Sequence, residues 1–433
     1  MRSIHCCVAT LLAVIGFGGS LLAQDQCCCQ PAPAPPAVPN YSGCLCERPA
    51  LLGDWLGARN CMLEHGMLWD INETSFFFGV ASGGAEQRFT YAGHGDILLK
   101  WDLHKVGTQE GFFLQMRAEH RYGQPISGSD GAFLPSTIAA SLPSPNSADL
   151  YLTNVLFTQL LSEDLAVFAG KLDTLDGDAN AFAHKRGTDQ FSNLAFVVNP
   201  LLLRSVPYST LGAGVSVLQE GKPIFTFTVL NPTDTANSSG FGELFAEGVS
   251  LVAEGTYRYD LNGYQGQQLF GATWSSRDYV SLGQDPRVVL PDVPIERAAG
   301  TWAFYWNTDQ YLVNYDDAPG KGWGTFARAS AADDQANPMA HYWSVGVGGD
   351  SPIACRRQDT FGVGYYYLST SDQIGPFLQA AFGPVGDGYG VEMYYNYEVT
   401  PWFHLTADMQ VLQPEPRDLN TALLCGLRGK LSF

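Results

Sequence analysis

Charged side chains recur at every second position between Leu114 and Tyr122. Arg117, Glu119 and Arg121 share one face of an extended chain there, since successive side chains of a strand point to opposite sides. Guanidinium groups donate hydrogen bonds and a carboxylate accepts them, so this ladder can exchange hydrogen bonds with hydroxyl groups in place of water. The alternative is a row of salt-bridged wall residues without a ligand. In both interpretations the chemistry is non-covalent.

Three further charged pairs have a spacing that suits one face of a strand. They lie near the start, in the middle and at the end of the chain, and we expect all of them to face an aqueous interior. The candidate lining residues are Asp96, Lys100, Arg117, Glu119, Arg121, Lys171, Asp173, Arg428 and Lys430.

The elements that must position these residues have a period of two. In the last eleven residues, the odd positions from Leu423 to Phe433 are mostly apolar, while Arg428 and Lys430 fall on the other face. A strand with one apolar and one cationic face is typical of a barrel wall between lipid and water. The same alternation is clearest in the ranges 96–103, 114–122, 249–258, 389–398 and 403–411.

The length of these ranges favours a barrel over a soluble sandwich. A tilted strand needs roughly 9–11 residues to cross a bilayer, whereas the strands of ordinary sheets average about 5–6. Aromatic residues such as Trp101, Tyr122, Tyr397 and Trp402 stand near the ends of the ranges, as interfacial girdles do. We therefore predict an all-β fold, a transmembrane antiparallel β-barrel of about 16 strands (about 16–18).

Composition supports this fold and excludes one class of partner. Charged residues make up 15% of the 433 residues and aromatic residues 12%, and the formal net charge is −19. Soluble domains average roughly 25% charged residues. An acidic chain poor in Lys and Arg lacks the basic surface that nucleic acid requires, so we expect no nucleic-acid partner.

Four segments follow one another along the chain. Residues 1–23 have the apolar run and small-residue end of a signal peptide. Residues 24–48 form a Cys/Pro-rich linker, 49–66 a short helical segment that we place on the periplasmic side, and 67–433 the barrel. We expect Asp54 to cap the helix and Gly66 to end it.

Cysteines crowd the region before the barrel. Cys27, Cys28, Cys29, Cys44, Cys46 and Cys61 predict disulfides in an oxidising compartment, with pairing left open. Binding of a soft metal by the vicinal cysteines is the alternative, and no histidine has zinc-site spacing to them. We therefore expect no metal and no cofactor.

Enzyme signatures are missing from the sequence. The eight histidines form no H-E-x-x-H motif, and no G-x-S-x-G elbow occurs. We expect no catalytic residues and no enzyme activity.

A series of short motifs, in order, resembles the carbohydrate-selective porins of the OprB type. It begins with the range 53–59, which reads G-D-W-L-G-A-R, and continues to the aromatic C-terminus over about residues 50–433. The matching elements are Gly66, Tyr91–Gly93 with Asp96, Arg117 with Arg121 and Gly123, Ala169–Asp173, Phe191, Asn193, Phe196, Asn199, Pro200, Pro207–Tyr208 and Leu211–Gly212.

This resemblance implies a 16-stranded outer-membrane barrel that passes monosaccharides and small oligosaccharides passively. The partners it implies are permeating sugars and outer-membrane lipid, with a single pore and a homotrimer both left open. Two other functions remain as alternatives. One is a structural envelope barrel tethered to a cell-envelope partner by residues 24–48, and the other is a secreted β-rich carbohydrate-binding protein.

Overall fold

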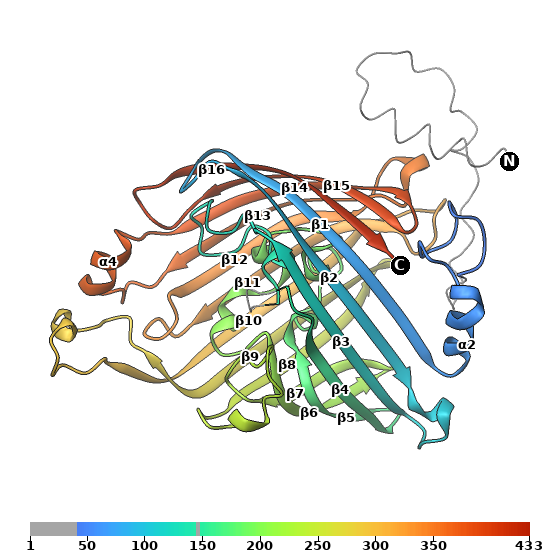
Figure 1. Cartoon of the computed structure of the whole chain (residues 1–433), viewed down its shortest axis with the longest axis horizontal. Coiled ribbons are helices and arrows are strands. Elements are labelled where there is room, and N and C mark those ends of the chain that lie inside the picture. Colours follow the sequence, from blue (N-terminus) through green and yellow to red (C-terminus); the bar gives the residue numbers. More distant parts are fainter. Residues whose placement is uncertain (1–40, 144–147) are drawn as a thin grey trace, which may run out of the picture.

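The chain folds into one closed antiparallel β-barrel of 16 strands (Figure 1). The structure is a computed structural model that describes residues 41–143 and 148–433. Each strand pairs with its neighbours in sequence, and β1 (Met67–Gly84) also pairs with β16 (Asn420–Ser432) to close the ring. The predicted fold class and strand number are confirmed.

The remaining strands are 9 to 18 residues long. They are β2 (Phe89–Asp102), β3 (Phe112–Gly123), β4 (Tyr151–Ser162), β5 (Leu165–Asp173), β6 (Ser209–Gln219), β7 (Lys222–Leu230), β8 (Ser250–Leu261), β9 (Tyr264–Val280), β10 (Arg297–Asn314), β11 (Gly322–Ala332), β12 (Met339–Asp350), β13 (Thr360–Thr370), β14 (Gly388–Thr400) and β15 (Phe403–Gln413).

Helices are short and lie between or before the strands. The α-helices are α2 (Ala58–Glu64), α3 (Leu194–Val197) and α4 (Pro376–Phe382). The 3₁₀ turns are η1 (Trp55–Gly57), η2 (Leu103–Val106), η3 (Ala139–Ser141), η4 (Thr174–Asp176), η5 (Lys185–Gly187), η6 (Pro200–Arg204), η7 (Phe241–Glu243), η8 (Pro286–Val289) and η9 (Ala354–Arg356). In the part of the chain that the structure describes, no helix has the length and apolar character needed to span a bilayer.

The two ends of the barrel differ in their connections. At the end that carries α2 and the C-terminus, which we call the turn end, several strands are joined by two residues, as at 163–164, 220–221 and 262–263. At the opposite loop end, where α4 lies in Figure 1, β3 and β4 are joined by a long connection, of which residues 124–143 and 148–150 are described, and residues 174–208 join β5 and β6. Short turns on one side and long loops on the other are typical of outer-membrane barrels.

Side chains alternate between the two faces of the wall as the sequence predicts. In β10, Phe304 is 61% exposed on the outer face, whereas Tyr305 is 4% exposed and Asn307 is fully buried. In β16, Leu427 is 50% exposed and Arg428 is fully buried. The five ranges read from the sequence fall on β2, β3, β8, β14 and β15, and the observed strands extend beyond most of them by a few residues.

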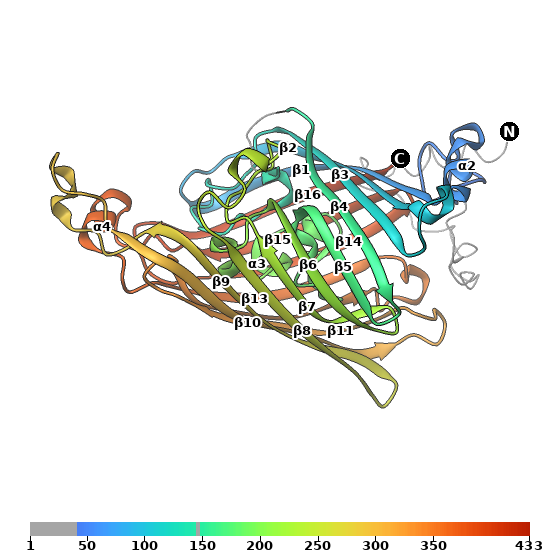
Figure 2. The same cartoon turned by 90° about the horizontal axis from the view of Figure 1, so that it is seen from below.

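The apolar core of the molecule lies inside the barrel. Residues 174–208, which include α3, are enclosed by the ring of strands (Figure 2). Phe191 and Phe196 in this segment are fully buried against Phe326 of β11 and Tyr394 of β14, with ring centroids 4.6–6.1 Å apart. A barrel of this size has a lumen wider than its wall side chains can fill, so an inserted segment is needed to shape it.

The segment before the barrel closes its seam at the turn end. The expected helix is present as α2, and Gly57 rather than Asp54 is its N-cap. Asp54 instead accepts a hydrogen bond from the backbone N–H of Asn60 at 2.8 Å. Gly66 follows the helix with φ +84°, and a Cβ atom there would lie 2.6 Å from the carbonyl oxygen of Asp102, so glycine is required.

Several predictions fall wholly or partly on residues outside the described part of the chain. These are the signal peptide at 1–23, most of the linker at 24–48 and the cysteines Cys27–Cys29. Cys44, Cys46 and Cys61 are described and form no disulfide with one another. The segment boundaries and the disulfide pairing stay predictions.

Arg59 joins three parts of the chain at this seam. Its guanidinium donates to the carbonyl oxygens of Phe433 at 2.7 Å and Trp69 at 2.8 Å, and it lies 3.9 Å from the ring centroid of Tyr41. The guanidinium is buried, so its hydrogen bonds are not replaced cheaply by water. The same arginine therefore holds the first strand, the last residue and the N-terminal segment together.

We expect Arg59→Ala to lower the free energy of unfolding by about 2–3 kcal/mol, since two partly buried carbonyl oxygens lose a charged donor. The measurement is the temperature at which the folded, fast-migrating band converts to the unfolded band on a denaturing gel. Lys105→Ala, at an exposed cation of the same end, is the control. Equal conversion temperatures for both variants and the parent would contradict this role.

Candidate functional site

The segment 174–208 crosses the lumen and is held to the wall by buried charges on three sides. The first attachment uses Arg117 of β3 and Arg186 of η5. Arg117 lies 3.2 Å from a carboxylate oxygen of Asp96, 3.0 Å from Asp173 and 2.8 Å from Asp176. Arginine pairs with several carboxylates at once because its planar guanidinium carries five donors.

Arg186 approaches the same carboxylates from the inserted segment. Its terminal nitrogens lie 2.5 Å from Glu119, 2.9 Å from Asp173 and 3.2 Å from Asp176. Glu119 also accepts from the hydroxyl groups of Thr153 and Tyr208. Two arginines and four carboxylates thus form one network that joins β2, β3 and β5 to the inserted segment.

The second attachment uses Arg328 of β11, which is almost fully buried. It donates to the carboxylate of Asp178 at 3.0 Å and to the carbonyl oxygens of Phe196 and Ala183 at 3.0 and 2.6 Å. Asn307 of β10 donates to the same carboxylate at 2.6 Å. Here the wall supplies the donors and the backbone of the segment supplies most of the acceptors.

The third attachment involves β14, β15 and β16. Arg428 donates to the carbonyl oxygens of Gly187 at 3.0 Å and Gln190 at 2.7 Å, and Lys430 lies 2.6 Å from the carboxylate of Asp189. Glu392 accepts from the backbone N–H groups of Ser192 at 2.5 Å and Asn193 at 3.0 Å. With all three sides held, the segment is a fixed part of the lumen.

Two carboxyl groups of the inserted segment have shifted pKa values. Burial acts to raise the pKa of Asp189, but the charge of Lys430 and its hydrogen bond outweigh burial and lower the value to about 2. Burial likewise opposes ionisation of Asp176, and the charges of Arg186 and Arg117 lower its pKa. Both carboxylates stay ionised over the neutral range, which keeps these attachments intact.

The structure brings several predicted lining residues together. Arg117, Glu119, Asp96 and Asp173 meet in the first attachment, and Arg428 and Lys430 in the third. Arg121 is partly buried toward the loop end of β3, and Lys100 is exposed toward the turn end of β2. Most of the predicted residues are therefore partners of the inserted segment.

Lys171 is a correction, because the structure places it on the outer face of the barrel. It pairs in register with Val155 and Leu211, whose side chains line an external groove together with Phe157. Its ammonium group donates to the carbonyl oxygen of Ser238 at 2.8 Å, under the β7–β8 loop. The expected face shared with Asp173 is not observed, since Asp173 contacts Arg117 and Arg186 in the lumen and also accepts from Leu175 N–H as the cap of η4.

The charged residues of the inserted segment that take part in the three attachments were not identified from the sequence. Arg186, Asp176, Asp178 and Asp189 lie in a stretch without strand or helix periodicity, so no face could be assigned to them. Arg328 sits at an inward position of β11 and could have been found by extending the alternation to that range.

One cluster has ligand atoms close enough to hold a metal ion. Possible ligand atoms of His94, Asp96 and Glu119 lie within 4.8 Å of one another. However, Arg117 already faces Asp96, and Arg186 faces Glu119. The two guanidinium groups supply the positive charge that a metal would bring, so this cluster suits an ion-pair network better than a metal centre.

A second inserted segment, residues 124–143, meets the β15–β16 loop at the loop end. Glu415 is fully buried and accepts from the backbone N–H of Phe133 at 2.8 Å. Burial, followed by repulsion from Asp130, raises the pKa of Glu415 to about 7, although the Phe133 N–H acts in the opposite direction. Burial raises the pKa of Asp130 as well.

Three cavities are stacked between the inserted segment and the strands β6–β10. The mouth cavity at the loop end has a volume of about 570 Å³, the middle cavity about 160 Å³ and the turn-end cavity about 740 Å³. Leu175, Leu203 and Val206 line both the mouth and the middle cavity. Inward positions of β8 pass from Glu254 in the middle cavity to Arg258 in the turn-end cavity.

The middle cavity is the smallest of the three and has two unlike sides. Aliphatic residues such as Leu202, Leu203 and Val252 line one part of it. Tyr305 of β10 donates to Glu254 of β8 at 2.6 Å across another part. The arrangement offers apolar contact beside hydrogen-bonding groups and carries no chemistry beyond non-covalent binding.

Comparison with known proteins agrees with this architecture. Residues 86–433 match the model of the family described as carbohydrate-selective porin, OprB family. The high-pH structure of Pseudomonas putida OprB superposes with a TM-score of 0.78 at 19% identity, covering 90% of this chain and 100% of that one. The low-pH structure of that protein gives 0.57 at 15% identity over 89% and 99% of the two chains.

The fold extends to a further porin. Outer-membrane expressed OmpT of Vibrio cholerae gives a TM-score of 0.51 at 11% identity, covering 85% of this chain and 97% of that one. No curated protein matches the sequence.

We expect Arg186→Gln to loosen the inserted segment, because Glu119 and Asp173 would lose a buried counter-charge. Removing one partner of a buried ion pair costs about 3–5 kcal/mol. The expected results are noisier single-channel currents and faster protease cleavage within 174–208. Lys185→Gln changes the same charge at the exposed neighbouring residue and should leave both unchanged. Currents from Arg186→Gln as quiet as those of the parent would contradict the network's role.

We expect the stability of the loop end to fall as pH rises from about 4.5 to 7. In this interval the folded state keeps the Glu415 proton that the unfolded chain releases, so folding is favoured at the lower pH. The measurement is the difference in unfolding temperature between pH 5 and pH 8. Glu415→Gln should reduce this difference, whereas Asp418→Asn, at an exposed carboxylate of the same loop, should not. An undiminished difference in Glu415→Gln would refute the assignment.

Proposed function

This chain belongs to the carbohydrate-selective porin family, OprB, and we propose that sugars pass through it along the wall formed by β6–β10. The protein is an outer-membrane channel for passive diffusion of carbohydrates, with a closed barrel as the conduit. The observation that carries the proposed path is the stack of three cavities between the inserted segment and the wall, on the side of the lumen between the first and second attachments.

The middle cavity is proposed as the constriction that selects solutes. This cavity has a volume of about 160 Å³ and lies between two cavities several times larger. A solute on this path therefore comes closest to the lining side chains there. The Glu254–Tyr305 pair exchanges hydrogen bonds with sugar hydroxyls, and the aliphatic side contacts the apolar face of a sugar ring. Binding at such a site must stay weak, since a permeating solute also has to leave.

The charged network gives the lining residues an indirect role in this proposal. Arg117, Glu119 and Asp96 position the inserted segment, and the segment in turn sets the width of the path. Asp173 belongs to the network and also lines the middle cavity. Arg428 and Lys430 act in the same way from β16, a few strands further around the wall. The homotrimer and the envelope tether through residues 24–48 stay predictions.

A planar bilayer experiment tests the function directly. We expect the purified chain to form channels whose current is interrupted in a saturable way by glucose or a maltodextrin. Channels that are indifferent to both sugars would leave a general porin. A folded, heat-modifiable barrel without channel activity would contradict the function.

The path is tested by a pair of neighbouring substitutions. Val252→Trp places a large ring in the middle cavity, and we expect it to lower conductance and sugar flux several-fold. Ala253→Trp places the same ring on the outer face of the same strand and should leave both near the parent value. Equal conductance in the two variants would show that solutes do not pass through this cavity.

A further inference from the structure

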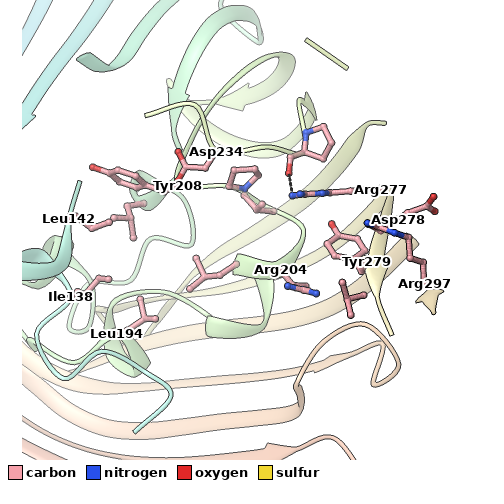
Figure 3. Close-up of a pocket in the computed structure, with 16 residues that line it drawn as sticks. Ile138, Leu142, Leu194, Arg204, Tyr208, Asp234, Arg277, Asp278, Tyr279 and Arg297 are labelled. Atoms are coloured by element: carbon pink, nitrogen blue, oxygen red, sulfur yellow. Dashed lines mark hydrogen bonds between the residues drawn. The ribbon is translucent and has the colours of Figure 1, made fainter. Parts of the chain in front are cut away.

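The mouth cavity contains a stack of cationic and aromatic groups that the path described above does not require. The guanidinium of Arg204 lies 4.7 Å from the ring centroid of Tyr279, and that of Arg277 lies 5.8 Å from the same ring (Figure 3). All three residues line the cavity of about 570 Å³. Arg204 comes from η6 of the inserted segment, and the other two come from β9.

Arg204 has unused hydrogen-bonding capacity. Its Nε donates to the carbonyl oxygen of Ala336 at 2.9 Å, which fixes the half-buried side chain in place. Among the described residues no carboxylate forms an ion pair with it. Burial and the charge of Arg277 lower the pKa of Arg204, while Tyr279 acts in the opposite direction. The two terminal nitrogens of its guanidinium can therefore donate two parallel hydrogen bonds to the oxygens of an anion.

Tyr279 adds a second, independent sign of a ligand. Its side chain is 4% exposed, and its hydroxyl group is buried without a hydrogen-bond partner among the described residues. A buried hydroxyl normally has a partner, because leaving it unpaired costs free energy. In Figure 3 the phenol lies between Arg204 and Arg277 at the wall of the cavity.

The other charged groups around the cavity are already engaged or exposed. Arg277 pairs with Glu247 at 2.6 Å and donates to the carbonyl oxygen of Pro232 at 3.3 Å. Asp234 accepts from the backbone N–H of Ala236 at 2.9 Å and lies near Lys171. Asp278 and Arg297 are exposed at the rim. The unmatched charge facing the cavity is thus the positive charge of Arg204.

We propose that Arg204 and Tyr279, assisted by the nearby charge of Arg277, bind the anionic group of an acidic saccharide at the mouth of the pore. The fork of Arg204 holds two oxygens of the anion, and the hydroxyl of Tyr279 donates to one of them. The rest of the cavity has room for the sugar ring. This inference rests on the proposed function, since it names a substrate class for the same path.

The test uses the full purified chain in planar bilayers with D-glucuronate and D-glucose as probes, which differ only in the group at one carbon. We expect glucuronate to interrupt the current at about tenfold lower concentration than glucose, as charged hydrogen bonds imply. Arg204→Gln should abolish this difference, and Tyr279→Phe should reduce it a few-fold. Sodium acetate distinguishes a sugar site from a general anion site, because acetate should interrupt the current far less than glucuronate.

Arg287→Gln is the matched control, since it removes one positive charge from an exposed loop at the same end, outside the cavity. Its channels should keep the preference for glucuronate. Calorimetric titration of glucuronate into the detergent-solubilised parent and Tyr279→Phe measures binding without any current, and folding is checked by heat-modifiable migration.

The outcomes separate the two proposals. Channels that respond to glucose but show no preference for glucuronate would overturn the mouth site and leave the porin function standing. An equal loss of the glucuronate preference in Arg287→Gln and Arg204→Gln would also overturn the mouth site. It would show that the preference comes from the total positive charge at this end of the barrel and not from a binding site. Absence of channels from the folded parent would overturn both.

Discussion

The structure depends on one constraint, which is that a 16-stranded barrel encloses more space than its own side chains can fill. The chain meets this constraint by folding residues 174–208 into the lumen, and the apolar core forms around Phe191 and Phe196 instead of between two sheets. A segment without regular structure brings many backbone polar groups into a buried place. These groups need partners, because a buried N–H or C=O without one is costly.

The inward-facing arginines supply many of those partners. Arg328 and Arg428 donate mainly to carbonyl oxygens of the inserted segment, whereas Arg117 and Arg186 bind carboxylates. The net charge of the chain is −19, and its buried arginines are positioned to donate hydrogen bonds to these acceptors. Side chains that resemble a ligand-binding ladder in the sequence thus bind the inserted segment, and in the proposed function they affect solute passage only through that segment.

The three charged attachments leave a row of cavities between the segment and the side of the wall formed by β6–β10. The cavities follow that side from the loop end to the turn end, and their volumes narrow in the middle. The polar residues that line the successive cavities differ, so on the proposed path a solute would meet Arg204 and Tyr279 before the Glu254–Tyr305 pair. Selection by charge at the mouth and by size and hydroxyl pattern at the constriction can then operate in sequence along one path.

The sequence by itself determined the strands and the faces of their side chains, because a period of two repeats within each strand and needs no distant partner. The barrel and the inward positions of Arg117, Glu119 and Arg428 could be predicted in this way. The helix before the barrel was predicted from residues that begin and end helices, and the strand number from the length of the chain and the family resemblance. The tertiary structure decided what the inward residues contact, since their partners lie on a segment whose path has no periodicity. It also placed Lys171 outside, where it donates to Ser238 O of the β7–β8 loop, whereas Asp173 two residues later contacts Arg117 in the lumen. The tertiary structure also decided the positions of the cavities, because these depend on where the inserted segment binds the wall.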